Sequence, residues 1–299
     1  MVRRATPSKR APRSSTARNS RPTRRLSTTD SYEYILGDSP KESERLRNQA
    51  RLWDPVSHAL FDRIAVGPGK RVLEVGPGQG SLHLELRRRV GGPVDAVERS
   101  PVFAPHITAL AARDGFGAGR TWQCDLLDAP LPRAHYDIIF ARWVFLFLPD
   151  PAAHLAKLVA ALRPGGVIAL QEYHRATLDM VPAQPDWAAF CAADRAFFAS
   201  QGGDVSIGSQ LPALLRDAGL QLDETHPTLR VGHPGSATWN WLSEYFLGVM
   251  DRMAEFPPFD AAAAARLRRG WLAAANDPSA MAVGPTVLDV VGRKVRKRR

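Results

Sequence analysis

The fold of this chain is decided by the stretch Val72-Leu73-Glu74-Val75-Gly76-Pro77-Gly78-Gln79-Gly80. A short apolar strand leads there directly into a glycine-rich turn, and the residues that follow predict a helix. Glycines allow backbone conformations with positive φ and let a ligand approach the main chain closely. Free N–H groups at the start of the helix favour a carboxylate or a phosphate. The stretch therefore predicts a strand–turn–helix unit that binds a ligand.

Strands and helices alternate along the chain on both sides of this unit. The predicted strands cover residues 71–75, 94–98, 121–124, 136–141, 167–173, 220–231 and 286–291. The predicted helices cover residues 40–52, 55–64, 81–90, 101–114, 152–162, 185–201 and 210–218. Apolar strands joined by helices are typical of a parallel sheet that is buried on both faces. The pattern predicts an α/β fold, a Rossmann-like seven-stranded and mostly parallel sheet with helices on both faces.

A long helical insert rich in aromatic residues is predicted over residues 236–276. We expect it either to form a lid over the substrate or to pack as a helical core. Trp239 and Trp241 are two positions apart, so one helix cannot point both side chains the same way.

The excess of basic residues lies at the two ends of the chain. The net charge is +10, with 40 basic and 30 acidic residues. Residues 1–29 hold nine of the basic residues and residues 293–299 hold six, with no acid in either segment. The other 25 are outnumbered by the acidic residues. We therefore expect a disordered basic tail over residues 1–30, a folded domain over 31–292 and a basic tail over 293–299. Nucleic acid would bind weakly, through these tails alone.

The sequence contains no pattern typical of export or membrane insertion. Cys124 and Cys191 lie far apart and fit neither a disulfide framework nor a zinc-ligand spacing. No apolar run reaches the roughly 18–20 residues that a membrane helix needs, and no apolar stretch follows the basic start. The histidines form no metal-binding HxH or HExxH cluster. We expect a cytoplasmic protein without a metal site.

Two details of the glycine-rich turn indicate which ligand it binds. Glycines stand at positions 76, 78 and 80, whereas the GxGxxG fingerprint of dinucleotide-binding folds requires glycine at the position of Ser81. Glu74 places a negative charge beside the turn, where it is a poor neighbour for a pyrophosphate and a good one for a cationic amine or sulfonium. Both details count against a NAD(P)-dependent oxidoreductase, which stays open as an alternative.

The segment resembles motif I of the class I S-adenosylmethionine (SAM)-dependent methyltransferases, written (V/L)(L/D)(E/D)xGxGxG. The resemblance implies that the loop cradles the methionine part of SAM, with Glu74 acting nearby. The loop residues concerned are Gly76, Gly78, Gln79 and Gly80.

Further elements follow in the order and spacing of that family. The second strand ends in Glu98, which the resemblance assigns to the two ribose hydroxyls, with Arg99 beside the adenine. Asp125 follows the third strand and matches the acid that accepts from the adenine amino group, with the Leu126 backbone alongside. After the fourth strand, the backbone at Arg142 is expected near the methionine moiety.

The first predicted helix and a later turn also match the family. Residues 34–49 resemble the lid helix of a bacterial small-molecule subgroup that is similar to the ubiquinone and menaquinone methyltransferases. The resemblance implies that Tyr34, Arg45 and Gln49 close over SAM. Residues 162–166 match the LxPGG turn before the fifth strand.

The resemblance implies SAM as cofactor and a small-molecule acceptor, a secondary metabolite or quinone-like compound, methylated on O, N or C. His174 lies at the end of the fifth strand, where open α/β sheets bind ligands, and is the candidate base. A base is not essential, because the sulfonium is already a good leaving group and alignment lowers the barrier. His154, in the helix after the fourth strand, is expected to be structural. An RNA-directed methyltransferase or another nucleic-acid-associated protein, using the basic tails, is a second alternative.

Overall fold

The computed structural model describes residues 40–296, with side chains from residue 44 onward. The predicted tail over residues 1–30, the predicted SAM contact Tyr34 and residues 297–299 lie outside the described part. Within that part, no helix combines the length and the apolar character needed to span a membrane.

The central element is a seven-stranded sheet in the order β3-β2-β1-β4-β5-β10-β7. Its strands are β1 (Val72–Val75), β2 (Asp95–Val97), β3 (Thr121–Trp122), β4 (Tyr136–Arg142), β5 (Leu162–His174), β7 (Gln221–Thr228) and β10 (Thr286–Arg293). Strands β3, β2, β1, β4 and β5 pair in parallel, and β10 is antiparallel to both β5 and β7. The predicted seven-stranded, mostly parallel α/β sheet is confirmed.

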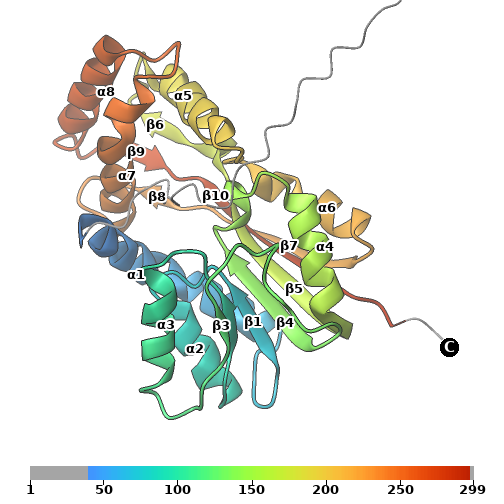
Figure 1. The fold of residues 1–299 in the computed structure, drawn as a ribbon. Helices are drawn as coiled ribbons and strands as arrows, with labels where there is room; N and C mark the ends of the chain where they lie inside the picture. Colours follow the sequence, from blue (N-terminus) through green and yellow to red (C-terminus); the bar gives the residue numbers. More distant parts are fainter. Residues whose placement is uncertain (1–39, 297–299) are drawn as a thin grey trace, which may run out of the picture. The chain divides into compact units, whose positions relative to one another are not determined.

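Helices cover both faces of this sheet, as Figure 1 shows. They are α1 (Pro40–Arg63), α2 (Ser81–Val90), α3 (Phe103–Ala111), α4 (Pro151–Ala161), α5 (Trp187–Ser200), α6 (Leu211–Asp217), α7 (Ala237–Met253) and α8 (Ala261–Ala274). Successive side chains of a strand point to opposite faces, so neighbouring residues of β4 belong to different hydrophobic clusters. Phe140 packs with Phe61 of α1 and Leu86 of α2, whereas Ile139 belongs to the cluster that contains Leu155 of α4.

The two helices predicted at the start of the described part form one continuous helix, α1. Pro55 lies inside it and removes a backbone hydrogen bond, which led us to expect a break. The helix continues because its inner face is anchored to the sheet. Trp53 is fully buried, and the Ser57 hydroxyl donates to Gln171 Oε1 of β5 at 2.6 Å.

The strand predicted over residues 220–231 is interrupted, which is a second correction. Its last part joins a separate three-stranded sheet with the order β6-β9-β8, made of β6 (Asp179–Val181), β9 (Met281–Val283) and β8 (Val231–Gly232). The chain leaves β7 because Arg230 turns toward α1. Its Nη2 donates to the Leu52 carbonyl at 3.0 Å, and its guanidinium lies 5.0 Å from the Trp53 ring centroid.

The aromatic insert is helical and forms α7 and α8. Its two neighbouring tryptophans point in different directions, as their spacing predicts. Trp239 stacks on Trp271 of α8 with ring centroids 4.7 Å apart, whereas Trp241 contacts Trp53 of α1 at 5.4 Å. One side of α7 therefore builds the core of the insert and the other side reaches the main sheet.

The segment predicted as a C-terminal basic tail begins inside the fold. Arg293 is the last residue of β10. The Lys294 ammonium donates to the carbonyls of Val159 and Leu162 at 2.6 and 2.7 Å, and its backbone N–H donates to Gly166. Lys294 thus ties this end of the sheet to α4 and β5, whereas the side chain of Arg293 is exposed.

Candidate cofactor and acceptor site

The glycine-rich loop after β1 has the conformation that its sequence predicts. Gly76, Gly78 and Gly80 adopt φ angles of 67°, 54° and 83°, a region that other residues rarely occupy. A Cβ at Gly76 would lie 2.6 Å from a methyl carbon of Val144, whereas a Cβ at Gly78 would meet nothing within 4 Å. Gln79, between Gly78 and Gly80, is half-buried. The loop is thus packed at its start and open in its middle, where a ligand can approach the backbone.

Glu98 at the end of β2 closes one side of the loop. Its carboxylate accepts the Gly78 N–H at 3.1 Å and the Ser100 N–H at 2.8 Å. The side chain is buried, and burial raises the pKa of its carboxyl in spite of these two bonds. The Arg99 backbone N–H also interacts with this carboxylate. A carboxylate has about four lone-pair directions, so it can still accept from a hydroxyl of a bound ribose.

Glu74, the acidic residue of β1, is already paired within the protein. Its Oε2 lies 2.9 Å from His83 Nδ1 of α2, and both side chains are buried. The pair fixes the strand to the helix that follows the glycine loop. We expected Glu74 to act near a cationic ligand, and the sequence reasoning did not identify His83, which lies nine residues further along the chain.

The predicted adenine contacts gather after β3. Asp125 Oδ1 accepts the Leu127 N–H at 2.9 Å, and His154 Nε2 of α4 lies 3.6 Å from the same oxygen. Its other oxygen lies 3.5 Å from the Arg99 guanidinium. The interaction with His154 lowers the pKa of the Asp125 carboxyl to about 2, so Asp125 is ionised at neutral pH. Leu126 is buried beneath this group.

The first turns of α1 bring the two described lid residues into contact. Arg45 Nη1 donates to Gln49 Oε1 at 2.9 Å. The same oxygen accepts the indole N–H of Trp241 at 3.2 Å. Gln49 is buried, so it joins α1 to the aromatic insert.

The side chain of Arg142 holds α1 against the end of β4. Its Nη1 donates to the Ser57 hydroxyl and its Nη2 to Asp54 Oδ1, both at 2.9 Å. The guanidinium carbon also lies 4.7 Å from the Trp143 ring centroid. With the side chain used in this way, only the backbone at Arg142 is open to the predicted role near the methionine moiety.

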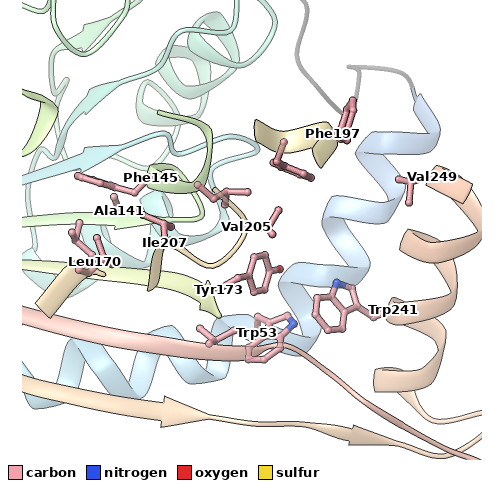
Figure 2. Packing of buried hydrophobic residues seen from close by; sticks show 14 of the residues in the cluster. Trp53, Ala141, Phe145, Leu170, Tyr173, Phe197, Val205, Ile207, Trp241 and Val249 are labelled. Atoms are coloured by element: carbon pink, nitrogen blue, oxygen red, sulfur yellow. The ribbon is translucent and has the colours of Figure 1, made fainter. Parts of the chain in front are cut away.

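An aromatic cluster lies beside this end of the sheet and was not predicted from the sequence as a unit. Trp143 stacks on Tyr173 with centroids 4.9 Å apart and meets the edge of Trp53 at 6.0 Å. Figure 2 shows Trp53, Tyr173 and Trp241 next to one another between α1, β5 and α7. We call Trp53, Trp143, Tyr173 and Trp241 the aromatic floor. The sequence signal for it was the occurrence of aromatic residues directly at the ends of two predicted strands.

Trp143 has an unusual backbone conformation. Its φ is +54°, which costs a residue with a Cβ about 1–2 kcal/mol. Such strain persists where the surroundings fix it, and it is found most often at functional sites. Here it turns the chain sharply after β4 and lays the indole on Tyr173.

His174 is placed away from the aromatic floor. It is the last residue of β5, and because strand side chains alternate, it points to the face opposite Tyr173. Its Nδ1 is buried without a hydrogen-bond partner among residues 44–296. The structure therefore brings Glu98, the glycine loop and Asp125 to one edge and does not add His174 to them. Over the same residues, no group of three or more His, Cys, Asp or Glu side chains could hold a metal ion.

Comparison with known proteins gives the class of this domain. Residues 73–170 match the family model described as a methyltransferase domain. Nocamycin O-methyltransferase from Saccharothrix syringae is 30% identical over 118 residues, which are 39% of this chain and 42% of that protein. Methyltransferase GfsG from Streptomyces halstedii is 28% identical over 67% of this chain and 72% of its own. The solved structure of the [4+2]-cyclase SpnF has a TM-score of 0.52 at 18% identity, covering 81% of each chain.

Residues 73–170 thus match a methyltransferase domain, in agreement with the sequence resemblance to the class I SAM-dependent methyltransferases, whose cofactor is SAM. The open loop at Gly78 and the remaining lone pairs of Glu98 fit this cofactor. The comparisons lend no support to the NAD(P)-dependent alternative. The chain spans less than half the length of nocamycin O-methyltransferase and of other curated relatives that it matches. The solved structure with the same fold is named as a cyclase, so the fold alone does not identify the reaction.

Proposed function

We propose that this protein transfers the methyl group of SAM to an O, N or C atom of a small, largely apolar acceptor that lies beside Trp143, the partly exposed member of the aromatic floor. The observation that carries the proposal is the position of two features at one edge of the sheet. The glycine loop with Glu98 follows β1 and β2, and Trp143 with Tyr173 ends β4 and β5. A secondary metabolite or quinone-like acceptor is supported by the names of relatives, which include nocamycin and tocopherol O-methyltransferases.

Each part of the site would have its own role in binding the cofactor or the acceptor. Backbone groups of the glycine loop hold the methionine part, Glu98 accepts the ribose hydroxyls and Asp125 accepts from the adenine amino group. When bound, SAM supplies an electrophilic methyl group on a sulfonium. The aromatic floor excludes water and orients the acceptor, and such alignment is a large part of the rate enhancement in reactions of this kind.

His174 stays our candidate for accepting a proton from the nucleophile. Its Nδ1, which is buried without a hydrogen-bond partner in the described part of the chain, supports this assignment. Tyr173 is not a base, because burial raises the pKa of its phenol. Its hydroxyl stays protonated and can donate a hydrogen bond to an acceptor oxygen.

The proposal is tested by incubating the protein with methyl-labelled SAM and a panel of small hydroxylated aromatics, amines and quinols. We expect label in at least one phenol or quinol and none in tRNA or other polyanions. The Trp143→Ala variant should lose transfer while still binding S-adenosylhomocysteine. Transfer to RNA alone would favour the nucleic-acid reading instead.

We also propose a cytoplasmic location for the protein. The proposal is supported by Cys124 and Cys191, which are both free thiols in the structure, as expected for a chain kept in a reducing compartment.

A further inference from the structure

Glu172 is a fully buried carboxyl group that the proposed reaction does not use. It lies in β5 and has no exposed surface. Its Oε1 accepts the backbone N–H groups of Val144 and Phe145, both at 2.7 Å. These groups begin the short helix η1 (Phe145–Phe147), which has no side-chain cap of its own. A neighbouring strand therefore supplies the cap that the local sequence lacks.

The segment held in this way lies between the two halves of the site. On one side, the Val144 methyl fills the space that a side chain at Gly76 would need, so it packs on the start of the glycine loop. On the other side, Trp143 takes its left-handed conformation and stacks on Tyr173. The two hydrogen bonds to Glu172 fix the main chain immediately after this strained residue.

We propose that Glu172 is a positioning residue that couples the cofactor loop to the aromatic floor by capping η1. The proposal rests on the proposed function, because it assigns the two halves of the site to SAM and to the acceptor. Glu172 acts through Val144 and Trp143 and touches neither ligand.

The surroundings of Glu172 specify the form of the carboxyl. Burial raises its pKa to about 8, so it is protonated at neutral pH. Leu288 of β10 lies across from it, and Gly208 packs on its carbonyl. Among the described residues, only burial and backbone N–H groups contribute to its shifted pKa, and the nearest ionisable side chain along β5 is Tyr173. Its Oε2 is buried without a hydrogen-bond partner in the described part. A glutamine keeps the accepting oxygen and the shape, whereas a leucine removes the acceptor.

The test compares Glu172→Gln and Glu172→Leu with the wild type in calorimetric titrations with S-adenosylhomocysteine, and in hydrogen exchange of segment 143–147. We expect Glu172→Gln to bind within about twofold of the wild type, and Glu172→Leu to bind at least tenfold more weakly with faster exchange of the Val144 and Phe145 amides. Asp137→Asn is the matched control. This buried carboxyl lies at the opposite end of β4 and accepts the Arg71 N–H at 2.8 Å, so its loss should leave both readouts unchanged.

The pH dependence of the affinity for S-adenosylhomocysteine is a second readout, which would not change if Glu172 only stabilised the fold. Between pH 7 and pH 9 the wild type should lose affinity as Glu172 ionises in apolar surroundings, and Glu172→Gln should lose less. The proposal would be overturned if Glu172→Leu bound S-adenosylhomocysteine as tightly as the wild type and showed the same amide exchange in segment 143–147. It would also be overturned if the affinity of the wild type and that of Glu172→Gln depended equally on pH. No binding by the wild type would overturn the proposed function, and the exchange data would then still decide whether Glu172 holds the segment.

Discussion

At the scale of single residues, Trp143 shows how the site uses backbone strain. A left-handed tryptophan at the end of a strand is unfavourable by itself, and three contacts compensate for it. They are the stack on Tyr173, the guanidinium of Arg142 and the hydrogen bonds from the next two residues to Glu172. The position of the indole is thus a consequence of contacts from the ends of two neighbouring strands, β4 and β5.

Replacement of Trp143 by glycine should destabilise the protein less than replacement by alanine. Both variants lose the stacked ring, but glycine adopts φ near +54° without strain. We expect Trp143→Gly to be more stable than Trp143→Ala by about 1 kcal/mol in urea unfolding. The reverse order would mean that the chain relaxes out of the left-handed conformation when the ring is removed.

The raised pKa of Glu172 predicts how stability depends on pH. The pKa of this carboxyl is raised by burial from its usual 4.5 in the unfolded chain to about 8 in the folded protein. Stability is therefore greatest below the lower value and falls as the pH rises between the two. We expect the Tm of the wild type to fall over this range more steeply than that of Glu172→Gln. Glu98 also has a raised pKa, so the variant should keep part of the slope; identical slopes would contradict the assignment.

At the scale of elements, α1 is attached to the sheet by a chain of buried polar groups. Arg142 donates to Ser57, Ser57 to Gln171 and Gln171 to Asp289 of β10, with distances of 2.9, 2.6 and 2.6 Å. These bonds hold the helix over the ends of β4 and β5, which explains why Pro55 does not divide it. Removing one member leaves the next polar group buried and unpaired.

A double-mutant cycle on Asp54 and Arg142 measures this attachment. Their side chains are only 17% and 11% exposed, so the pair is poorly screened by water. We expect Asp54→Asn and Arg142→Met to interact by about 1–3 kcal/mol in chemical unfolding. Additive effects would show that α1 is held by Trp53 and its apolar neighbours alone.

The elements predicted from the sequence are those with a strong local pattern. The strand over residues 71–75 and its glycine turn were found because apolar residues and glycines stand next to each other in the chain. The small sheet of β6, β8 and β9 was missed because its strands have two or three residues and meet from distant parts of the sequence. Glu98 was predicted as a ribose contact from its place in a motif. The roles of His83 and Glu172 depend on contacts between separate elements, which periodicity does not reveal.

At the scale of the whole molecule, the excess of basic residues lies in a different part of the sequence from the residues of the predicted cofactor site. Nine basic residues lie in residues 1–29, whereas the site contains Glu74, Glu98 and Asp125. Deletion of residues 1–29 should therefore lower the salt concentration that elutes the protein from heparin and leave the affinity for S-adenosylhomocysteine unchanged. A large loss of that affinity would assign the segment to the cofactor site.

The most direct test of the central claim is a calorimetric titration of the purified protein with S-adenosylhomocysteine, beside Glu98→Ala and Glu98→Gln. We expect saturable binding by the wild type and at least tenfold weaker binding by Glu98→Ala, because the ribose hydroxyls lose their acceptor. Glu98→Gln should lie between the two, since it keeps one accepting oxygen. No binding by the wild type, or equal affinity in all three proteins, would contradict the placement of SAM at this edge of the sheet.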